Sequence, residues 1–225
     1  MMKLKSLIKK IFFGGELIEE IESPINGKIQ VLEQLSGKKF IRVGGITQSG
    51  GMVDKIWEKV LADLHCSLFN IHNSLILGLG CGTVAELLAK KWPDIRITGI
   101  EIDPKMIEIG KKYFNLGKIP NLEIFKGDAI SLVKNPKFIV HNSKFNLILV
   151  DFYLGQDFPV QAENERFLKN LKKILTKNGL IIFNRLNFGK HKKNTTAFFK
   201  KLKSQFQKVK TIKTGFNLFF VCQLA

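Results

Sequence analysis

From residue 74 onward, short apolar segments alternate with segments of helical period, and this alternation constrains the fold most strongly. Strands that alternate with helices form a parallel sheet covered by helices on both faces. The last two strands are separated by Thr214-Gly215-Phe216 alone, which predicts an antiparallel hairpin at one sheet edge. Strands are predicted at 74–79, 96–102, 122–126, 145–150, 179–184, 209–213 and 217–223, and helices at 52–64, 83–91, 104–115, 161–176 and 194–206.

The first fifty residues follow a different pattern. Residues 3–13 place apolar side chains at helical spacing with lysines opposite, and we expect a short helix that docks on its own domain or a partner subunit rather than on an anionic membrane. Residues 28–43 alternate on either side of a glycine-containing turn, which is typical of a β-hairpin. We therefore expect a helix and hairpin extension over 1–50 and a main domain over 51–225.

The net charge of +17, from 36 basic and 19 acidic residues, would suit a polyanionic partner, because lysines that neutralise phosphates release counterions. Four of the basic residues are arginines, the type that specific phosphate and base recognition favours. We therefore expect a solvated lysine-rich surface, and nucleic-acid binding or nucleic-acid methylation ranks below it. The same interpretation applies to one predicted helix and its approach, which contain Lys190, Lys192, Lys193, Lys200, Lys201 and Lys203.

Composition excludes several classes of protein. An apolar fraction of 45% excludes wholesale disorder, and no apolar run reaches the roughly 18–20 residues of a membrane span. The three cysteines are far apart and form no metal-binding pattern with the histidines, so no metal site is predicted. Without a secretory signal pattern at its start, the chain is expected to be cytoplasmic.

Three glycines, Gly78, Gly80 and Gly82, occur where the first of the alternating strands ends. Glycine lets the backbone approach a ligand closely and adopt a positive φ, and the carboxyl ends of the strands are the default ligand site of an open α/β sheet. A dinucleotide fingerprint would have its third glycine at position 83, where this chain has threonine. We interpret the loop as ligand-binding; a tight turn without a ligand is the alternative.

The next three strands also end in groups suited to a nucleoside. Glu101 ends the second strand, where a carboxylate can accept two hydrogen bonds from a ribose diol, and Ile102 can cover one face of an adenine. Asp128 ends the third strand and can accept from an exocyclic amine beside the small Ala129, although a helix N-cap explains it equally well. Asp151 ends the fourth strand, where an acid can meet a substrate or a cationic cofactor group.

In this order, the glycine loop, the ribose-binding acid, Gly127-Asp128-Ala129 and the strand-four acid resemble the class I S-adenosylmethionine-dependent transferases. That family includes methyltransferases and polyamine synthases. The resemblance covers about residues 74–223 and implies an α/β fold, a Rossmann-like seven-stranded class I methyltransferase sheet with a small N-terminal β-hairpin extension. It also implies S-adenosyl-L-methionine, or decarboxylated S-adenosylmethionine, as the cofactor, bound by the glycine loop, Glu101, Ile102, Asp128, Ala129 and Asp151.

The N-terminal hairpin and Gly45-Ile46-Thr47-Gln48 are similar to the corresponding region of spermidine synthases, which implies that Gln48 reaches the nucleoside. Several positions depart from that subfamily. Its loop aspartate is Cys81 here, the second of its paired acids is Leu154, and a histidine of the following helix is Trp57. A neutral Cys81 would tolerate the carboxylate of the full cofactor, and the loss of one acid weakens recognition of a diamine.

We therefore expect methyl transfer to a small or amine-bearing acceptor, with Asp151 orienting or deprotonating the nucleophile and Tyr153 lining its pocket. Aminopropyl transfer to a polyamine and a nucleoside-binding protein without catalysis are the alternatives. A homodimer through the N-terminal helix and hairpin is a further expectation.

Overall fold

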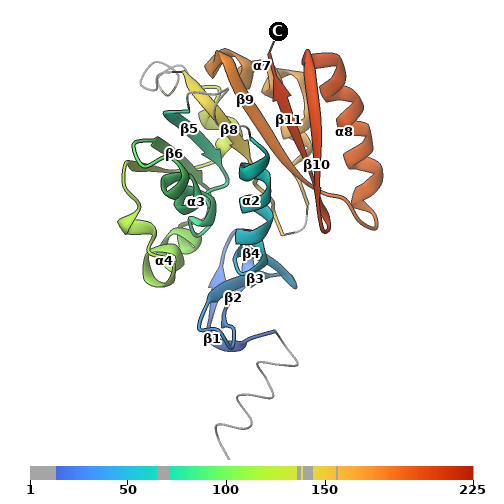
Figure 1. Cartoon of the computed structure of the whole chain (residues 1–225). Helices are drawn as coiled ribbons and strands as arrows, with labels where there is room; N and C mark the ends of the chain where they lie inside the picture. Colours follow the sequence, from blue (N-terminus) through green and yellow to red (C-terminus); the bar gives the residue numbers. More distant parts are fainter. Residues whose placement is uncertain (1–13, 65–70, 136–137, 139–143, 156, 225) are drawn as a thin grey trace, which may run out of the picture.

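The computed structural model describes residues 14–64, 71–135, 138, 144–155 and 157–224, which form two sheets with helices around the larger one (Figure 1). The helix predicted over 3–13 lies outside the described residues, and the homodimer through it stays a prediction. Within the described ranges, no helix is long and apolar enough to cross a membrane. The same ranges hold no cluster of three or more histidine, cysteine or acidic side chains that could bind a metal ion.

The larger sheet has seven strands in the order β10-β11-β9-β8-β5-β6-β7. Neighbouring strands from β9 to β7 are parallel, whereas β11 is antiparallel to both β9 and β10. The predicted fold class is thus confirmed, including the antiparallel hairpin at one edge. The strands are β5 (Asn73–Leu77), β6 (Arg96–Glu101), β7 (Leu122–Lys126), β8 (Phe145–Val150), β9 (Leu175–Leu186), β10 (Lys208–Thr214) and β11 (Asn217–Gln223).

Helices cover both faces of this sheet because its central strands are apolar on both sides. Successive residues of a strand point to opposite faces. Leu75 and Leu77 of β5 therefore pack in one cluster with α7 and α8, and Ile76 between them packs in another with α2 and α3. The helices are α2 (Met52–Asp63), α3 (Thr83–Lys91), α4 (Pro104–Tyr113), α5 (Ala129–Leu132), α7 (Glu165–Ile174) and α8 (His191–Gln205), with short 3₁₀ turns η2 (Leu116–Lys118) and η3 (Val160–Glu163).

The N-terminal part is a four-stranded antiparallel sheet, which is larger than the predicted hairpin. Its strands are β1 (Glu16–Ser23), β2 (Gly27–Glu33), β3 (Lys39–Val43) and β4 (Ile46–Gly50), and the predicted hairpin is β2 and β3. The glutamate-rich β1 and the short polar β4 lack the apolar alternation that marks a half-buried strand. The division into two domains at residues 50 and 51 stays a prediction.

Two kinds of contact hold the N-terminal sheet on the larger domain. Asp103, which is fully buried, caps α4 by accepting from the Lys105 amide (2.8 Å), and it also accepts from Ser23 Oγ and from Asn26 Nδ2 (2.6 Å) after β1. An apolar cluster lies between the two parts and contains Ile29, Val31, Ile41, Val43, Cys81, Met106 and Ile109. In Figure 1 this sheet lies below the larger one, so its strand β4 reaches the carboxyl ends of the parallel strands.

The predicted helix 161–176 is two elements in the structure. Asn164 separates η3 from α7, and its side-chain oxygen accepts from the Phe167 amide at 2.8 Å. An asparagine N-cap begins a new helix because its side chain satisfies an amide that has no partner within the helix.

Candidate functional site

A cavity of about 480 Å³ opens at the carboxyl ends of the parallel strands, between them and the N-terminal sheet. Its position follows from the topology. After β5 the chain passes to β6 and β7 on one side and later returns to β8 on the other side of β5. The crevice at such a switch point is where ligands bind in open α/β sheets, and a cavity of about 300–1,000 Å³ suits a small molecule.

The glycine loop brings the ends of β5 and β8 into contact. The amides of Gly78 and Leu79 both donate to the Ile100 carbonyl at 3.0 Å. Gly78 has a φ of +93°, and a Cβ there would lie 2.4 Å from the carbonyl oxygen of Asp151. Gly78 and Gly80 line the cavity, whereas Gly82 does not; it precedes α3 and leaves room for the Leu116 side chain.

Glu101 lies at the end of β6 and is 7% exposed. Its two carboxylate oxygens accept from the amides of Gly80 (2.7 Å) and Asp103 (2.9 Å). Burial raises the pKa of Glu101, and these two hydrogen bonds oppose the shift. Each carboxylate oxygen can accept a further hydrogen bond. Ile102 beside it also lines the cavity and is 38% exposed, so an acceptor pair lies next to an apolar surface.

Asp128 and Ala129 lie at the end of β7 and line the same cavity. Asp128 is the N-cap of α5: it accepts from the amides of Ile130 (3.1 Å) and Ser131 (3.2 Å) and from the Ser131 hydroxyl (2.6 Å). The two interpretations of Asp128 are therefore compatible, because the exposed carboxylate that begins the helix also faces the cavity.

Asp151 is held by side chains from two other elements, and a third element supports one of them. Its two oxygens accept from Trp57 Nε1 of α2 (3.0 Å) and from Asn184 Nδ2 of β9 (2.7 Å). The Asn184 side-chain oxygen in turn accepts from Asn217 Nδ2 at the start of β11 (2.8 Å). Burial raises the pKa of Asp151 to about 6, although both hydrogen bonds lower it. In the described part of the chain, no lysine or arginine forms an ion pair with this carboxylate, so neutral donors alone position it.

Tyr153 lines the cavity, but its hydroxyl is engaged with the backbone of β9. The hydroxyl donates to the Asn184 carbonyl (2.9 Å) and accepts from the Leu186 amide (3.0 Å). Burial raises the pKa of Tyr153 above its usual range. Its ring can shape the pocket, while its hydroxyl is not free to exchange a proton with a ligand.

Gln48 of β4 closes the cavity from the N-terminal side. Its Nε2 donates to the Gly155 carbonyl at 3.0 Å, which ties β4 to the loop after β8. Leu154 of that loop also lines the cavity and is 50% exposed.

The expectation that Cys81 faces the cofactor is not met. Its thiol is fully buried in the apolar cluster under the N-terminal sheet, 3.5 Å from the Met106 carbonyl, and the residue does not line the cavity. Gly80 and Gly82 on either side have positive φ, and the side chain between them points away from the cavity. A neutral group at position 81 therefore does not explain which form of the cofactor this site accepts.

Sequence reasoning missed Trp57, Asn184 and Asn217 as site residues. Asn184 directly follows the apolar run Leu180–Phe183, so the strand-end argument that identified Asp151 would have found it. Trp57 has no strand-end signal, although the resemblance to spermidine synthases marks its position as one where that subfamily has a histidine. It lies on the apolar stripe of its helix, is fully buried and packs edge-on against Phe219, and its ring N–H alone distinguishes it from a core residue.

A family model described as a methyltransferase domain matches residues 72–219. The chain is 28% identical over 136 residues to a polyamine aminopropyltransferase of Vibrio vulnificus, covering 60% of this chain and 45% of that protein. It is 30% identical over 114 residues to the eEF1A lysine and N-terminal methyltransferase homolog of Drosophila melanogaster, covering 49% of this chain and 17% of that protein. The chain thus spans less than half the length of these relatives.

Two solved structures show the same fold. A spermidine synthase of Thermotoga maritima superposes with a TM-score of 0.73 at 18% identity and covers 93% of this chain and 73% of that one. Human methyltransferase-like protein 13, in complex with SAH, superposes with a TM-score of 0.63 at 23% identity and covers 77% of this chain and 82% of that one.

Proposed function

Because this chain belongs to the methyltransferase domain family, we propose that it is an S-adenosylmethionine-dependent transferase that methylates an amine-bearing acceptor. The cofactor, when bound, supplies a methyl group activated by a sulfonium. The chain itself has to hold the cofactor, orient the acceptor and keep water out of the site.

The residues around the glycine loop fit such a cofactor. Glu101 offers two carboxylate oxygens to a ribose diol, and the exposed side of Ile102 suits an adenine face. Gly80 has a φ of +57°, and a Cβ there would lie 2.9 Å from Ser49 Oγ, so glycine lets the loop pass this close to β4. Asp128 is placed to accept from an exocyclic amine, and Gln48 contributes from the N-terminal sheet.

The Asp151 carboxylate is the observation that carries the acceptor assignment. With a pKa near 6 it is largely ionised at neutral pH, and it has no cationic partner among the described side chains. A carboxylate in this state can accept a hydrogen bond from an acceptor amine and take up the proton that the nitrogen releases on alkylation. Trp57 and Asn184 fix its orientation, and the ring of Tyr153 forms part of the wall beside it.

Methyl transfer ranks above aminopropyl transfer because Leu154 leaves Asp151 without a second acid for a diamine. Aminopropyl transfer is the second candidate. It is supported by the four-stranded N-terminal sheet with Gln48 over the cavity, and by the similarity to polyamine aminopropyltransferases.

Calorimetric titration with S-adenosylmethionine, its decarboxylated form and methylthioadenosine tests the proposal. We expect the full cofactor to bind more tightly than the decarboxylated form. Glu101→Gln should weaken its binding about 100-fold, since charge-assisted hydrogen bonds contribute about 1.5–3 kcal/mol each. The matched control is Glu108→Gln, an exposed glutamate paired with Lys105 on α4.

A preference for the decarboxylated form would replace methyl transfer with aminopropyl transfer. Binding of the nucleoside compounds without transfer to any amine would leave a nucleoside-binding protein. The absence of binding for all three would contradict the cofactor assignment altogether.

A further inference from the structure

The net positive charge of the chain comes almost entirely from its last sixty residues. Residues 166–225 contain thirteen lysines and two arginines and neither aspartate nor glutamate, so this segment carries fifteen of the seventeen net charges. A charge asymmetry of this size between two parts of a chain is typical of proteins that bind polyanions. From the sequence alone we expect these lysines to form a solvated face, with a binding surface as the alternative.

The structure gathers several of these lysines around the first turns of α8. A shallow hollow there is lined by Gly189, Lys192, Lys193, Thr196, Ala197 and Lys200. The three lysines are exposed, and among the described residues no carboxylate forms an ion pair with any of them. The first turn of α8 contains no acidic residue either, so the partial positive charge of the helix terminus adds to theirs.

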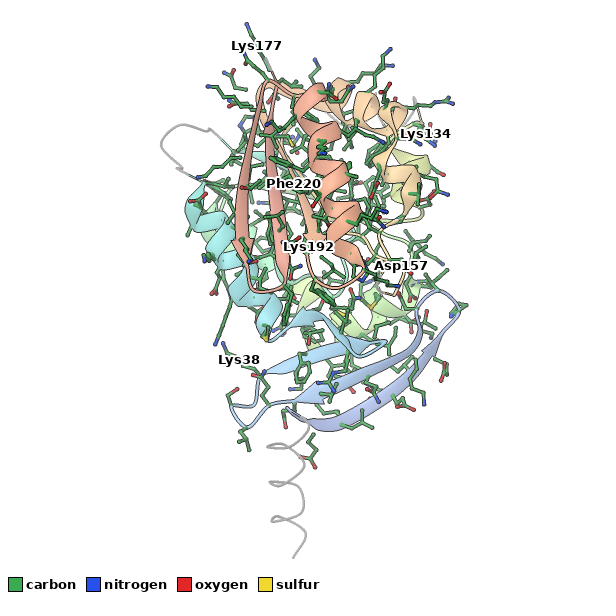
Figure 2. The ribbon with its side chains drawn as sticks, turned by 90° about the vertical axis from the view of Figure 1, so that its right-hand side faces the viewer. Lys38, Lys134, Asp157, Lys177, Lys192 and Phe220 are labelled. Atoms are coloured by element: carbon green, nitrogen blue, oxygen red, sulfur yellow. The ribbon has the colours of Figure 1, made fainter. Side chains whose placement is uncertain are left out.

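This end of α8 lies close to the mouth of the cavity. Lys190 is paired with Asp157, at 3.4 Å, in the segment that follows the loop after β8. Figure 2 shows Lys192 and Asp157 at the same end of α8, on the side of the N-terminal sheet. Two residues next to this region line the cavity itself. Leu186 is the last residue of β9, ahead of α8, and Asn217 is the first residue of β11, after the β10–β11 turn.

An aromatic rim, formed by Phe188, His191 and Phe216, adjoins the hollow and the cavity mouth. Phe216 lies in the tight β10–β11 turn and is 65% exposed. The Phe188 ring lies 5.4 Å from the rings of both Phe216 and His191. The Asn187 amide donates to the Phe216 carbonyl at 2.7 Å, which holds the two loops together.

We infer that this face binds single-stranded nucleic acid, with its phosphates on Lys192, Lys193 and Lys200 and one base stacked on Phe216. Unpaired lysines alone would suit any polyanion. An exposed aromatic ring beside them favours an unpaired base, because a base has an apolar face that an acidic peptide lacks and a duplex hides. Such binding does not depend on whether the chain transfers a methyl group.

Fluorescence anisotropy of a labelled twelve-nucleotide oligouridine tests the inference on the full chain. The charge-reversal pair Lys192→Glu/Lys193→Glu should weaken binding at least about tenfold at moderate salt. Lys111→Glu/Lys118→Glu makes the same change in net charge at exposed positions of α4 and η2, and should weaken it less than about threefold. Phe216→Ala should weaken binding about five- to tenfold without a change in charge, and Phe216→Trp should restore it.

Three outcomes would overturn the inference. The absence of oligouridine binding at low salt would refute it. Equal losses of affinity in the two charge-reversal variants would show diffuse electrostatic attraction rather than a site. Binding of polyglutamate or of a duplex as tightly as oligouridine, with no effect of Phe216→Ala, would assign the face to another polyanion. All the substituted side chains are exposed, and circular dichroism of each variant checks that it has folded.

Discussion

The two walls of the cavity are built in different ways. The glycine-loop wall, formed by the ends of β5, β6 and β7, gets its geometry from nearby backbone: Glu101 is held by the amides of Gly80 and Asp103, and Asp128 by the first turn of its own helix. The Asp151 wall depends on the side chains of Trp57, Asn184 and Asn217, which come from α2, β9 and β11. The first wall is therefore held by backbone amides at most 21 residues away in sequence, whereas the second needs side chains that are 33 to 94 residues apart.

The largest effect is expected where the two walls meet. Gly78→Ala places a Cβ 2.4 Å from the Asp151 carbonyl oxygen at a φ of +93°, so it should destabilise the protein by about 3 kcal/mol or more. Gly27→Ala is the matched control, because its φ is +62° but no atom lies within 4 Å of the added Cβ, and it should cost about 1 kcal/mol. Urea unfolding measures both. Equal losses would mean that the walls are not in tight contact at Gly78.

The next prediction concerns pH and isolates the Asp151 wall. The pKa of Asp151 rises from 3.8 to about 6 on folding, so the folded state holds this proton more tightly than the unfolded state. The resulting contribution to stability is present at low pH and is lost as the pH rises from about 4 through 6, by about 2–3 kcal/mol. The raised pKa of Glu101 acts in the same direction.

Asp151→Asn should remove this contribution, so the ligand-free wild type should lose about 2–3 kcal/mol of stability relative to the variant between pH 4 and 7.5. Urea unfolding at a series of pH values measures the difference. The same substitution should abolish transfer to an amine acceptor. Parallel stability curves would contradict the raised pKa of Asp151 in the ligand-free protein.

The smallest effect sharpens the role of Trp57. Its N–H donor lowers the pKa of Asp151, so Trp57→Phe should raise that pKa and move the acidic limb of the pH–rate profile to higher pH. Trp92→Phe, which changes a tryptophan outside the cavity, should leave the limb in place. A Trp57→Phe profile that loses rate equally at every pH would indicate packing alone.

Much of the fold could be predicted because its signals are local. The strands from β5 to β10 alternate with helices, and the central ones are apolar on both faces, which leaves few arrangements other than a covered parallel sheet. The strands β1 and β4 escaped prediction because they are polar, with glutamates along β1 and a short run before Gly50 in β4. Their pairing is decided by neighbouring strands and by the anchor that Asp103 offers to Ser23 and Asn26.

The candidate site likewise has a part that local signals predict and a part that distant contacts decide. The sequence by itself determined which polar groups lie at the ends of strands. The carboxyl ends of parallel strands share one edge of the sheet whatever the order of the strands, so these groups come together. Tertiary structure alone decided where the side chains between those ends point: Cys81 into the apolar cluster, Trp57 onto Asp151, and Tyr153 onto the β9 backbone. A side chain's direction depends on the packing of elements that are distant in sequence, and no local pattern records it.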